Sequence, residues 1–371
     1  GMTLSAEQTP PPPMFTPYAL RDMKLKNRIV FAPTLMYSAE NGVVNAFHQN
    51  HYSARALGGA ALVMAEMTAV TPEGRVTPGC AGLWNDEQVV RQVQQNGACM
   101  GIQLGHAGRR GSTLRGWENV NKPLQSDNWD LLSASAIAYD QDSATPAAIT
   151  REQMDTIRDA FIAATQRADQ AGFDCIELQA AHGYLLSSFI SPLTNQRTDE
   201  FGGSLENRMK FPLEVFTAMR AVWPENKPMF VRISATDWAE GGTTVDEAVE
   251  IARLFKAAGA DLIDVSSGEV VKAQKPIYGR MFQTPFADRV RNEAGIATMA
   301  VGAILEADHA NSIIAAGRAD LCALSRGFLA NPNWPLHEAA KLGYHQVAWP
   351  KQYQWGQDWL ERNENRPVLQ G

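Results

Sequence analysis

The sequence predicts a single α/β domain in which eight parallel strands, each followed by a helix, close into a barrel. Short apolar runs alternate with amphipathic helical patterns along most of the chain. The runs are rich in Val, Ile, Leu and Met, which is typical of parallel strands buried on both faces. A doubly wound open sheet is the competing architecture, but no GxGxxG motif follows the first run. The (β/α)8, or TIM, barrel is therefore favoured.

The apolar runs predict the strands, and the segments between them predict the helices. The runs cover residues 29–33, 61–66, 100–104, 175–179, 229–233, 262–265, 298–301 and 321–324. The helical patterns cover residues 47–57, 86–96, 151–171, 204–223, 245–258, 285–293, 307–316 and 331–342. Gly172, Gly259 and Gly317 are expected at helix ends, because glycine readily adopts the positive φ found there. Asp86 and Thr150 are expected to cap helix N-termini.

Composition and charge exclude several classes of function. The 371 residues carry 33 Lys+Arg against 40 Asp+Glu, a formal net charge of −7, whereas nucleic-acid binders show a basic surplus or stripe. No apolar run reaches the roughly 18 residues that a membrane span requires. The four cysteines form no CxxC pair, which disfavours a structural zinc, an iron–sulfur cluster and a disulfide scaffold. We expect a cytoplasmic protein that binds small molecules and no metal.

Three segments stand outside the strand–helix alternation. Residues 1–13 end in four prolines and are expected to form a disordered arm before a barrel at 14–345. Residues 346–371 form a polar tail with several aromatic side chains, among them Trp355, which need a surface such as a subunit interface. Residues 105–150 form a long loop, which we expect to lie over the C-terminal face of the barrel, where barrel chemistry takes place.

Arg232 is the most informative single residue, because it lies inside the apolar run Met-Phe-Val-Arg-Ile-Ser. An uncompensated buried charge costs several kcal/mol, so this guanidinium group needs a partner. One interpretation is a structural ion pair with Asp264 or Glu177. The other is a ligand that carries or develops negative charge, and for a barrel interior we favour the ligand.

Further polar residues follow the strands at the end where barrel active sites form. His182 and Tyr184 come after the fourth strand, and an imidazole near a phenol suits hydrogen bonding and proton transfer. These strand ends hold no carboxylate pair suited to glycoside hydrolysis and no cluster of metal ligands. Turns at the ends of the last three strands contain Ser267, Gly268, Gly302, Ala303, Ser325 and Arg326. Because barrels often bind phosphate after strands 7 and 8, we favour a bound phosphate over glycines that only make tight turns.

In combination, these segments resemble the flavin-dependent old yellow enzyme family, in particular its small bacterial ene reductases. The similarity extends roughly from residue 14 to residue 360. It rests on residues 25–33 (Leu-Lys-Asn-Arg-Ile-Val-Phe-Ala-Pro), 101–109 (Gly-Ile-Gln-Leu-Gly-His-Ala-Gly-Arg), 180–185 (Ala-Ala-His-Gly-Tyr-Leu), 191–208, 231–234 and 317–321. Residues 111–113 and 278–286 are more similar to the reductase modules fused to flavin hydroxylases that act on salicylyl-CoA and 2-aminobenzoyl-CoA.

The resemblance implies a barrel that binds FMN noncovalently. Hydride would pass from NAD(P)H through flavin N5 to an electron-poor C=C bond of an α,β-unsaturated carbonyl compound. By position, the implied cofactor-binding residues are Ala32, Pro33, Thr34, Leu35, Met67, Gln103, Arg232, Ser267, Gly268, Gly302, Ala303, Ser325 and Arg326. Among them, Gln103 and Arg232 correspond to residues at the pyrimidine edge of the flavin.

The same resemblance assigns the substrate side of the site. Gln179 and His182 would bind the substrate carbonyl oxygen and polarise the alkene, and Tyr184 would donate a proton to the α-carbon. Tyr37 corresponds to a tyrosine of the substrate pocket. Trp355 corresponds to a tail residue contributed by a neighbouring subunit, which implies a homo-oligomer, either a dimer or a tetramer.

Three residues depart from the family pattern. Gln179 replaces the histidine or asparagine of the usual substrate-binding pair. Leu35 stands where a cysteine or threonine normally approaches the N5/O4 edge of the flavin, and Met67 replaces a small residue near it. We expect these changes to alter the substrate range and the reduction potential.

Two other functions stay open at the level of sequence. One retains FMN but reduces a dearomatised aromatic-CoA intermediate, with Arg109, Arg110 and Arg115 meeting the CoA phosphates. A solvated loop explains these three arginines equally well. The other is a barrel that binds a flavin or a phosphorylated ligand without redox chemistry, which the departures at Leu35 and Gln179 suggest.

Overall fold

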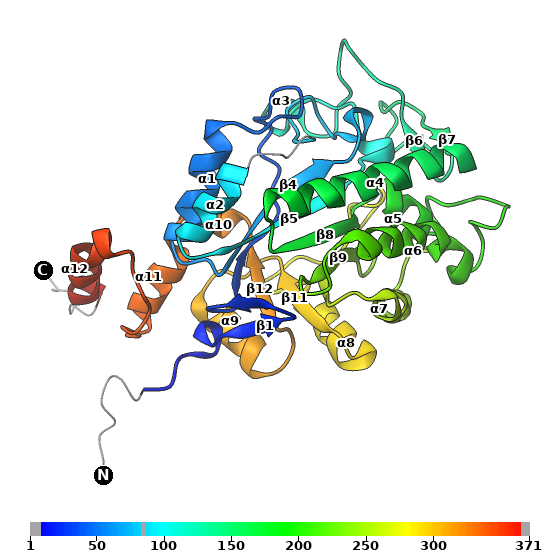
Figure 1. Ribbon diagram of the computed structural model, residues 1–371. Coiled ribbons are helices and arrows are strands. Elements are labelled where there is room, and N and C mark those ends of the chain that lie inside the picture. Colours follow the sequence, from blue (N-terminus) through cyan, green and yellow to red (C-terminus); the bar gives the residue numbers. More distant parts are fainter. Residues whose placement is uncertain (1–8, 83–86, 365–371) are drawn as a thin grey trace, which may run out of the picture.

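The predicted barrel is confirmed in the computed structural model, which describes residues 9–82 and 87–364 (Figure 1). Eight parallel strands close on themselves, because the last strand pairs with the first. In order around the barrel they are β3 (Ile29–Phe31), β4 (Leu62–Ala69), β5 (Cys99–Gly105), β8 (Cys175–Ala180), β9 (Met229–Ser234), β10 (Leu262–Ser266), β11 (Ala297–Val301) and β12 (Leu321–Leu324).

Helices surround the barrel close to the predicted positions. They are α1 (Ala46–Leu57), α2 (Glu87–Gln95), α4 (Arg151–Ala171), α6 (Leu205–Val222), α7 (Val245–Ala258), α8 (Thr284–Ala294), α9 (Ala307–Ala315) and α11 (Trp334–Lys341). Gly172 and Gly259 end α4 and α7 with φ of 91° and 111°, as the glycine positions predict. Gly317 also has a positive φ, 67°, shortly after α9. The predicted cap Asp86 lies outside the described residues.

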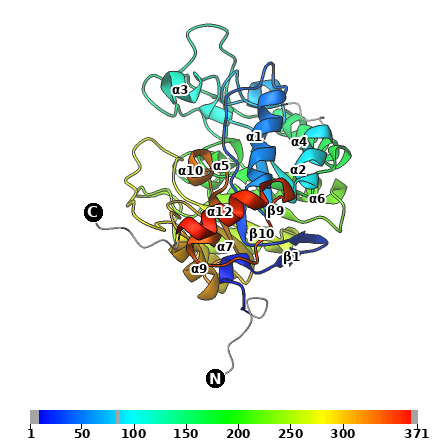
Figure 2. The ribbon, with the colours of Figure 1, turned by 90° about the vertical axis from the view of Figure 1, so that its left-hand side faces the viewer.

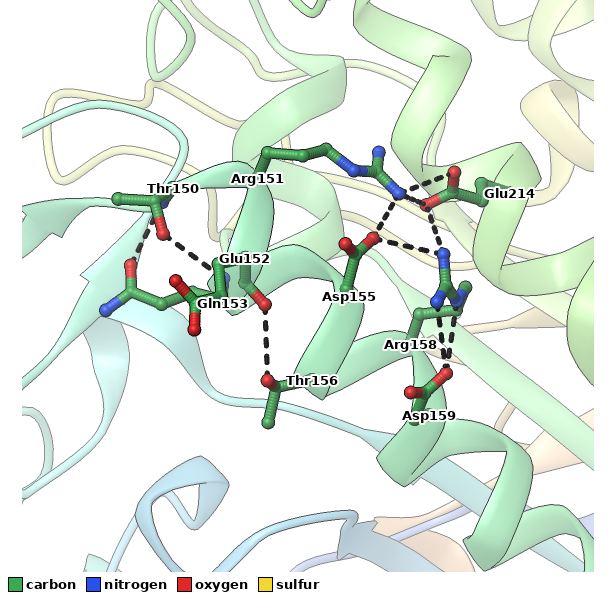
Figure 3. A network of polar contacts seen from close by, with 9 residues as sticks. All are labelled: Thr150, Arg151, Glu152, Gln153, Asp155, Thr156, Arg158, Asp159 and Glu214. Carbon is green, nitrogen blue, oxygen red and sulfur yellow. Dashed lines mark hydrogen bonds and ion pairs between the residues drawn. The ribbon is translucent and has the colours of Figure 1, made fainter.

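The predicted cap at Thr150 is confirmed, and charged side chains then tie α4 to α6. The Gln153 N–H donates to Thr150 Oγ1 at 3.1 Å, and the Thr150 N–H donates to Gln153 Oε1 at 2.9 Å. Figure 3 shows Arg151 between Asp155 and Glu214, at 2.5 Å and 2.8 Å. Because these charges are partly exposed, the ion pairs contribute little to stability, and we attribute the start of α4 to the capping box.

The side chains that fill the barrel interior continue into a hairpin that the sequence did not predict. Strands β1 (Tyr18–Leu20) and β2 (Met23–Leu25) pair antiparallel at the end opposite the long loop (Figure 1). Met23 and Leu25 are buried in one cluster with interior residues such as Leu62 and Phe230. The hairpin therefore closes the N-terminal end of the barrel and leaves the C-terminal end for a ligand.

The remaining elements lie in the loops and the tail. They are the short helices α3 (Gly116–Asn119), α5 (Leu185–Ile190) and α10 (Arg326–Ala330), the strands β6 (Leu132–Ser133) and β7 (Ala147–Ala148), the 3-10 turns at Pro13–Phe15, Pro72–Gly74, Gly108–Arg110 and Lys351–Tyr353, and helix α12 (Gln354–Glu364). Helix α12 lies at the periphery beside α11 (Figures 1 and 2). Of the predicted N-terminal arm, residues 1–8 lie outside the described residues, and Pro13 begins a turn whose Met14 and Phe15 are buried.

Among the described helices, none combines the length and the hydropathy that a membrane span requires.

Candidate active site

Polar residues from four adjacent strands meet inside the barrel because of the strand register. Gln103 of β5 pairs with Glu177 of β8, and Arg232 of β9 pairs with Gln179 of β8 and with Asp264 of β10. Neighbouring residues at equal height on parallel strands lie side by side. The register therefore places one guanidinium group beside two carboxyl groups and two amides.

Both interpretations of Arg232 find support in its surroundings. Its Nε donates to Asp264 Oδ2 at 2.7 Å and lies 3.7 Å from Glu177 Oε2, so the predicted ion pair is present. Its Nη2 is buried and has no hydrogen-bond partner among the described residues. The carboxylates thus hold one edge of the guanidinium group, and the other edge keeps a donor for a ligand.

Glu177 is the more perturbed of the two acidic neighbours of Arg232. Burial raises the pKa of Glu177 well above its usual range, and the nearby Asp264 raises it further. The Glu177 carboxyl group accepts a hydrogen bond from Gln103 Nε2 at 2.7 Å. The cluster tolerates burial because Arg232 lies against the acidic side chains of Asp264 and Glu177.

Gln179 sits between this cluster and the candidate substrate site. Its amide nitrogen donates to Gln103 Oε1 at 3.3 Å, and its carbonyl oxygen accepts from the Ala181 N–H at 2.8 Å. These bonds fix the orientation of the amide. One of its two amide hydrogens is used, so one is left for a ligand.

His182 and Tyr184 lie together beyond β8, with ring centroids 6.4 Å apart. The His182 N–H donates to Ser234 Oγ at 2.9 Å, and its Nε2 is 2.7 Å from Ser266 Oγ. Burial lowers the pKa of His182 well below its usual value, and Arg232 and Arg110 lower it further. The imidazole is therefore neutral. Ser234 holds the backbone of His182, and Ser266 holds its ring.

Tyr184, beside this histidine, and Tyr37 are both protonated phenols. Burial raises the pKa of Tyr184 above its ordinary value. Burial, together with Tyr184, raises the pKa of Tyr37 to about 12. The Tyr37 ring packs edge-on against Trp117 of the long loop, with centroids 5.5 Å apart. Both hydroxyl groups can therefore act as proton donors at neutral pH.

The predicted phosphate turns do come together. They line a cavity of about 640 Å³ whose walls include Gly302, Ala303, Ser325 and Arg326. At its edge, Thr34 Oγ1 is 2.7 Å from Ser325 Oγ, which joins the end of β3 to the end of β12. A cavity of this volume is within the range of cofactor sites.

A second, smaller cavity adjoins the first, and two of its residues, Trp238 and Gln283, had no predicted role. It measures about 170 Å³ and lies beside His182, Ser267, Trp238 and Gln283. Trp238 Nε1 donates to Ser267 Oγ at 2.9 Å, and that hydroxyl donates to Gln283 Oε1 at 2.6 Å. Ser267 is therefore engaged by protein partners, and Gly268 follows it with a φ of 66°. The sequence feature that points to this pocket is segment 278–286, which was singled out for its similarity to the fused reductase modules and contributes Tyr278, Phe282 and Gln283 to the walls.

Three residues predicted to contact the cofactor are buried or half-buried, whereas one residue predicted to contact the substrate is exposed. Leu35 is half-buried, Met67 is 5% exposed, and Ala32 is buried in the interior cluster at the end of β3. Trp355 is 88% exposed on α12, at the periphery of this chain (Figure 1). The single chain does not bring Trp355 into the site, and its action in a neighbouring subunit stays a prediction.

Glu66 is a buried residue of the site that the sequence analysis left without a role. It lies near the end of β4 and accepts a hydrogen bond from the Ala81 N–H at 3.3 Å. Its Oε2 is 3.8 Å from His48 Nε2. Burial raises the pKa of Glu66 to about 8. Its only sequence signal is a carboxyl group within an apolar strand, the same signal that drew attention to Arg232.

The arginines of the long loop are not a solvated group. Arg109 is 3% exposed and donates to the carbonyl oxygens of Ile137, Ala138 and Val270. The interpretation as a solvated loop is therefore wrong for Arg109, because its guanidinium group joins the long loop to the loop after β10.

The other two arginines of this group are also engaged. Arg110 donates to the carbonyl oxygens of His182 and Glu269 at 2.8 Å and 3.0 Å. Arg115 pairs with Glu118 at 3.4 Å on the surface. The three side chains therefore do not converge on an open surface where CoA phosphates would bind.

The residues fit the flavin that the resemblance implies. A buried cationic donor and two amides face the interior, and the phosphate turns line a separate large cavity. A flavin carries negative charge at both ends when it is reduced, because its phosphate is anionic and its ring accepts electrons. The donor set matches that distribution of charge.

Comparison with known proteins gives the same assignment. Residues 13–343 match the model of the NADH:flavin oxidoreductase / NADH oxidase family. NADPH dehydrogenase of Geobacillus thermodenitrificans is 43% identical over 351 residues, which cover 92% of this chain and 98% of the relative. NADPH dehydrogenase of Halalkalibacterium halodurans is 42% identical over 348 residues, covering 92% of this chain and 97% of that protein.

Solved structures agree on the fold. Morphinone reductase superposes with a TM-score of 0.75 at 27% identity, covering 92% of this chain and 91% of its own. A 2-naphthoyl-CoA reductase superposes with a TM-score of 0.78 at 23% identity, covering 90% of this chain and 53% of its own, and this likeness concerns the fold alone. With the matching family model and curated relatives above 40% identity, the chain belongs to the NADH:flavin oxidoreductase / NADH oxidase family, the FMN-dependent barrels of the old yellow enzyme type.

Proposed function

We propose that this oxidoreductase uses NAD(P)H to reduce an electron-poor C=C bond of an α,β-unsaturated carbonyl compound. The observation that carries the proposal is the neutral His182 beside the protonated Tyr184, both next to the buried donor of Arg232. When bound, FMN would supply the chemistry of hydride transfer between NAD(P)H and the alkene. The protein residues supply binding, polarisation and a proton.

Arg232 and Gln103 would hold the pyrimidine edge of the flavin. The unpartnered Nη2 of Arg232 offers a charge-assisted hydrogen bond, which stabilises negative charge more strongly than a neutral donor does. Asp264 Oδ2 lies 2.7 Å from Arg232 Nε and fixes the guanidinium plane, so the arginine needs little reorganisation when negative charge develops on a ligand. The turns at Gly302, Ala303, Ser325 and Arg326 would hold the phosphate.

His182 and Gln179 would bind the carbonyl oxygen of the substrate. Withdrawing electron density through that oxygen makes the β-carbon more electrophilic. A neutral imidazole has one N–H, and for this role it must lie on Nδ1. The Ser266 hydroxyl group would then donate to Nε2, 2.7 Å away, and fix the ring in place. Tyr184 would then donate its phenolic proton to the α-carbon, and because its pKa is raised it carries that proton at neutral pH.

The test is a two-part measurement on the purified protein. We expect a yellow protein with the visible spectrum of bound flavin, which NAD(P)H bleaches and an enone then restores under anaerobic conditions. A protein that takes up FMN and is bleached, but is not reoxidised by any enone or nitroalkene, would contradict the proposed substrate class. Membership of a flavin oxidoreductase family favours this function over a barrel without redox chemistry.

An aromatic thioester is a second candidate substrate, supported by the smaller cavity. Trp238, Tyr278 and Phe282 contribute aromatic side chains to it, and it reaches His182. A planar ring could stack there while its carbonyl group meets the histidine. This candidate requires that aromatic CoA esters change the flavin spectrum at lower concentration than the free acids do, and an equal response to both would argue against it.

The exposed tail supports a proposal about assembly. Trp355 and Trp359 are 88% and 62% exposed on α12. Large exposed aromatic side chains are typical of protein interfaces. We infer a homo-oligomer in which this helix packs on a second copy of the chain and brings Trp355 to its active site.

A further inference from the structure

We propose that the long loop after β5 contains a binding site for a small monovalent anion, separate from the sites of flavin and substrate. The site is a cavity of about 70 Å³ under the loop, and Arg109, Arg110 and Trp129 contribute to its walls. Its other walls come from loop residues such as Thr113, Leu131 and Tyr139. No acidic residue lines it in the described part of the chain.

The first argument is a local excess of positive charge. Arg109 is 3% exposed, and Arg110 is partly buried next to it. Across the described ranges, neither guanidinium group has a carboxylate oxygen within the 4.0 Å limit of an ion pair, whereas the surface cations of the same loop, Arg115 and Lys122, pair with Glu118 and Asp142. Carbonyl oxygens satisfy part of the arginine hydrogen bonding, but they carry no net charge to balance two buried cations.

The pKa of Arg109 reflects this imbalance. Burial lowers the pKa of Arg109 to about 10, and the neighbouring Arg110 lowers it further. The ring of Tyr139 faces both guanidinium groups, 5.3 Å from Arg109 and 4.5 Å from Arg110, and offers only the partial negative charge of its π face. A bound anion would supply the missing countercharge.

The second argument is a set of unused hydrogen-bond donors on residues that line this cavity. Arg109 Nε, Arg110 Nε and Trp129 Nε1 are each buried without a partner among the described residues. All three are donors that cannot accept. A buried donor left unsatisfied costs about 1–3 kcal/mol, so three on one small cavity indicate an acceptor that binds there.

Size and charge together identify the class of ligand. A cavity of about 70 Å³ has room for a few water molecules or for one halide- or formate-sized anion. Water would satisfy the donors but would bring no negative charge to the two arginines. A phosphorylated or CoA-type ligand is too large for this volume. The cavity therefore fits a small monovalent anion.

The site borders the active site through Arg110. The same guanidinium group donates to the carbonyl oxygen of His182 at 2.8 Å and lies over the ring of Tyr184, 5.4 Å from its centroid. An anion bound to Arg110 would therefore hold in place the arginine that supports both residues. The binding itself does not depend on the proposed reaction, and the test below uses no activity measurement.

The experiment is a titration of the full chain with sodium bromide after dialysis into sodium gluconate. Ionic strength is held constant, and gluconate is too large for the cavity. We expect bromide and formate to raise the melting temperature along a saturable curve, because a ligand that binds only the folded state stabilises it. Crystals soaked in bromide should show an anomalous peak between Arg109, Arg110 and Trp129. An equal response to bromide and gluconate, or water without an anomalous peak, would overturn the proposal.

Two variants and a matched control sharpen the test. Trp129→Phe keeps the ring but removes one donor, and it should weaken bromide binding roughly tenfold, as the loss of one hydrogen bond to a charged group does. Arg110→Gln should abolish binding. Lys122→Gln removes a charge from the same loop, where it is exposed and paired with Asp142, and it should leave the affinity within about twofold. If Lys122→Gln weakens binding as much as Trp129→Phe, the effect is general electrostatic screening and the site is refuted.

Discussion

At Arg232, a structural ion pair and a ligand site share one guanidinium group. The sequence presents these as alternatives, because a charge in an apolar strand needs one compensating partner. The strand register makes them compatible, since Asp264 occupies Nε and leaves Nη2 without a partner. Register between strands is not visible in a single sequence, and for that reason the arginine could be predicted as important but its partner could not.

Tyr184 gives the most direct prediction about the reaction. Tyr184→Phe removes the phenolic proton but keeps the ring under Arg110. We expect alkene reduction to slow by about 10²–10⁴-fold, the usual contribution of a general acid, while NAD(P)H reduces the flavin at an unchanged rate. Stopped-flow measurement of the two half-reactions separates these effects. Equal losses in both would show that the residue is structural rather than a proton donor.

Glu66 predicts a pH dependence of stability. Its pKa is raised to about 8 in the folded protein, above the ordinary value of 4.5, so the folded state binds its proton more tightly than the unfolded state does. The stability contribution of the protonated form is complete below pH 4.5 and is lost as the pH rises toward 8. Glu66→Gln stays neutral, so its stability relative to the wild type should rise between pH 5 and pH 8.

Urea denaturation at both pH values measures this difference. Glu73→Gln is the matched control, because Glu73 is an exposed carboxylate in the turn after β4. It should change stability by a few tenths of a kcal/mol at most, equally at both pH values. A difference between wild type and Glu66→Gln that does not vary with pH would mean that Glu66 is ionised in the folded protein.

At the scale of elements, long periodic segments are predictable and short ones are not. Helix α4 has the predicted bounds because a capping box begins it and Gly172 ends it. Strands β1 and β2 have three residues each, and in β2 the exposed Lys24 lies between two buried residues. A pattern this short cannot be distinguished from a loop in the sequence. Helix α12 was expected only as an aromatic tail, because its apolar residues face outward and form no buried stripe.

The capping box of α4 can be tested with two threonines of the same segment. Thr150→Ala removes the side-chain acceptor for the Gln153 N–H and should lower the free energy of unfolding by about 1 kcal/mol. Thr156 is an exposed residue inside the helix (Figure 3), where alanine is a better helix former. Thr156→Ala should therefore be neutral or slightly stabilising in the same denaturation experiment. Equal destabilisation by both changes would contradict the role of the cap.

At the scale of the whole molecule, barrel closure explains how much of the site was predictable. Residues between 32 and 326 meet at one end because they lie near the end of a strand or just after it, and the eight-strand pattern is visible in the sequence. The fold of the loop after β5 is not, since it depends on arginines that bind carbonyl oxygens far along the chain, such as Arg109 with Val270. Such contacts leave no periodic signal.

The proposed assembly gives a prediction at this scale. Replacing Trp355 and Trp359 together by serine should weaken self-association without unfolding the barrel, because both side chains are exposed on α12. Light scattering after size exclusion, over a range of concentrations, measures the effect. Leu254→Ser, at a 36% exposed position on α7, is the control and should leave the mass unchanged. The same mass for all variants would exclude the tail as an interface.

The central claim is that the unpartnered edge of Arg232 stabilises negative charge on the reduced flavin. Arg232→Lys keeps a cation for Asp264 but loses the planar second edge that carries Nη2. The loss of one charge-assisted hydrogen bond to the reduced flavin costs about 1.5–3 kcal/mol, which corresponds to roughly 30–60 mV for a two-electron couple. We predict that the midpoint potential of bound FMN falls by this amount in Arg232→Lys. A variant that binds FMN with the wild-type potential would contradict the account.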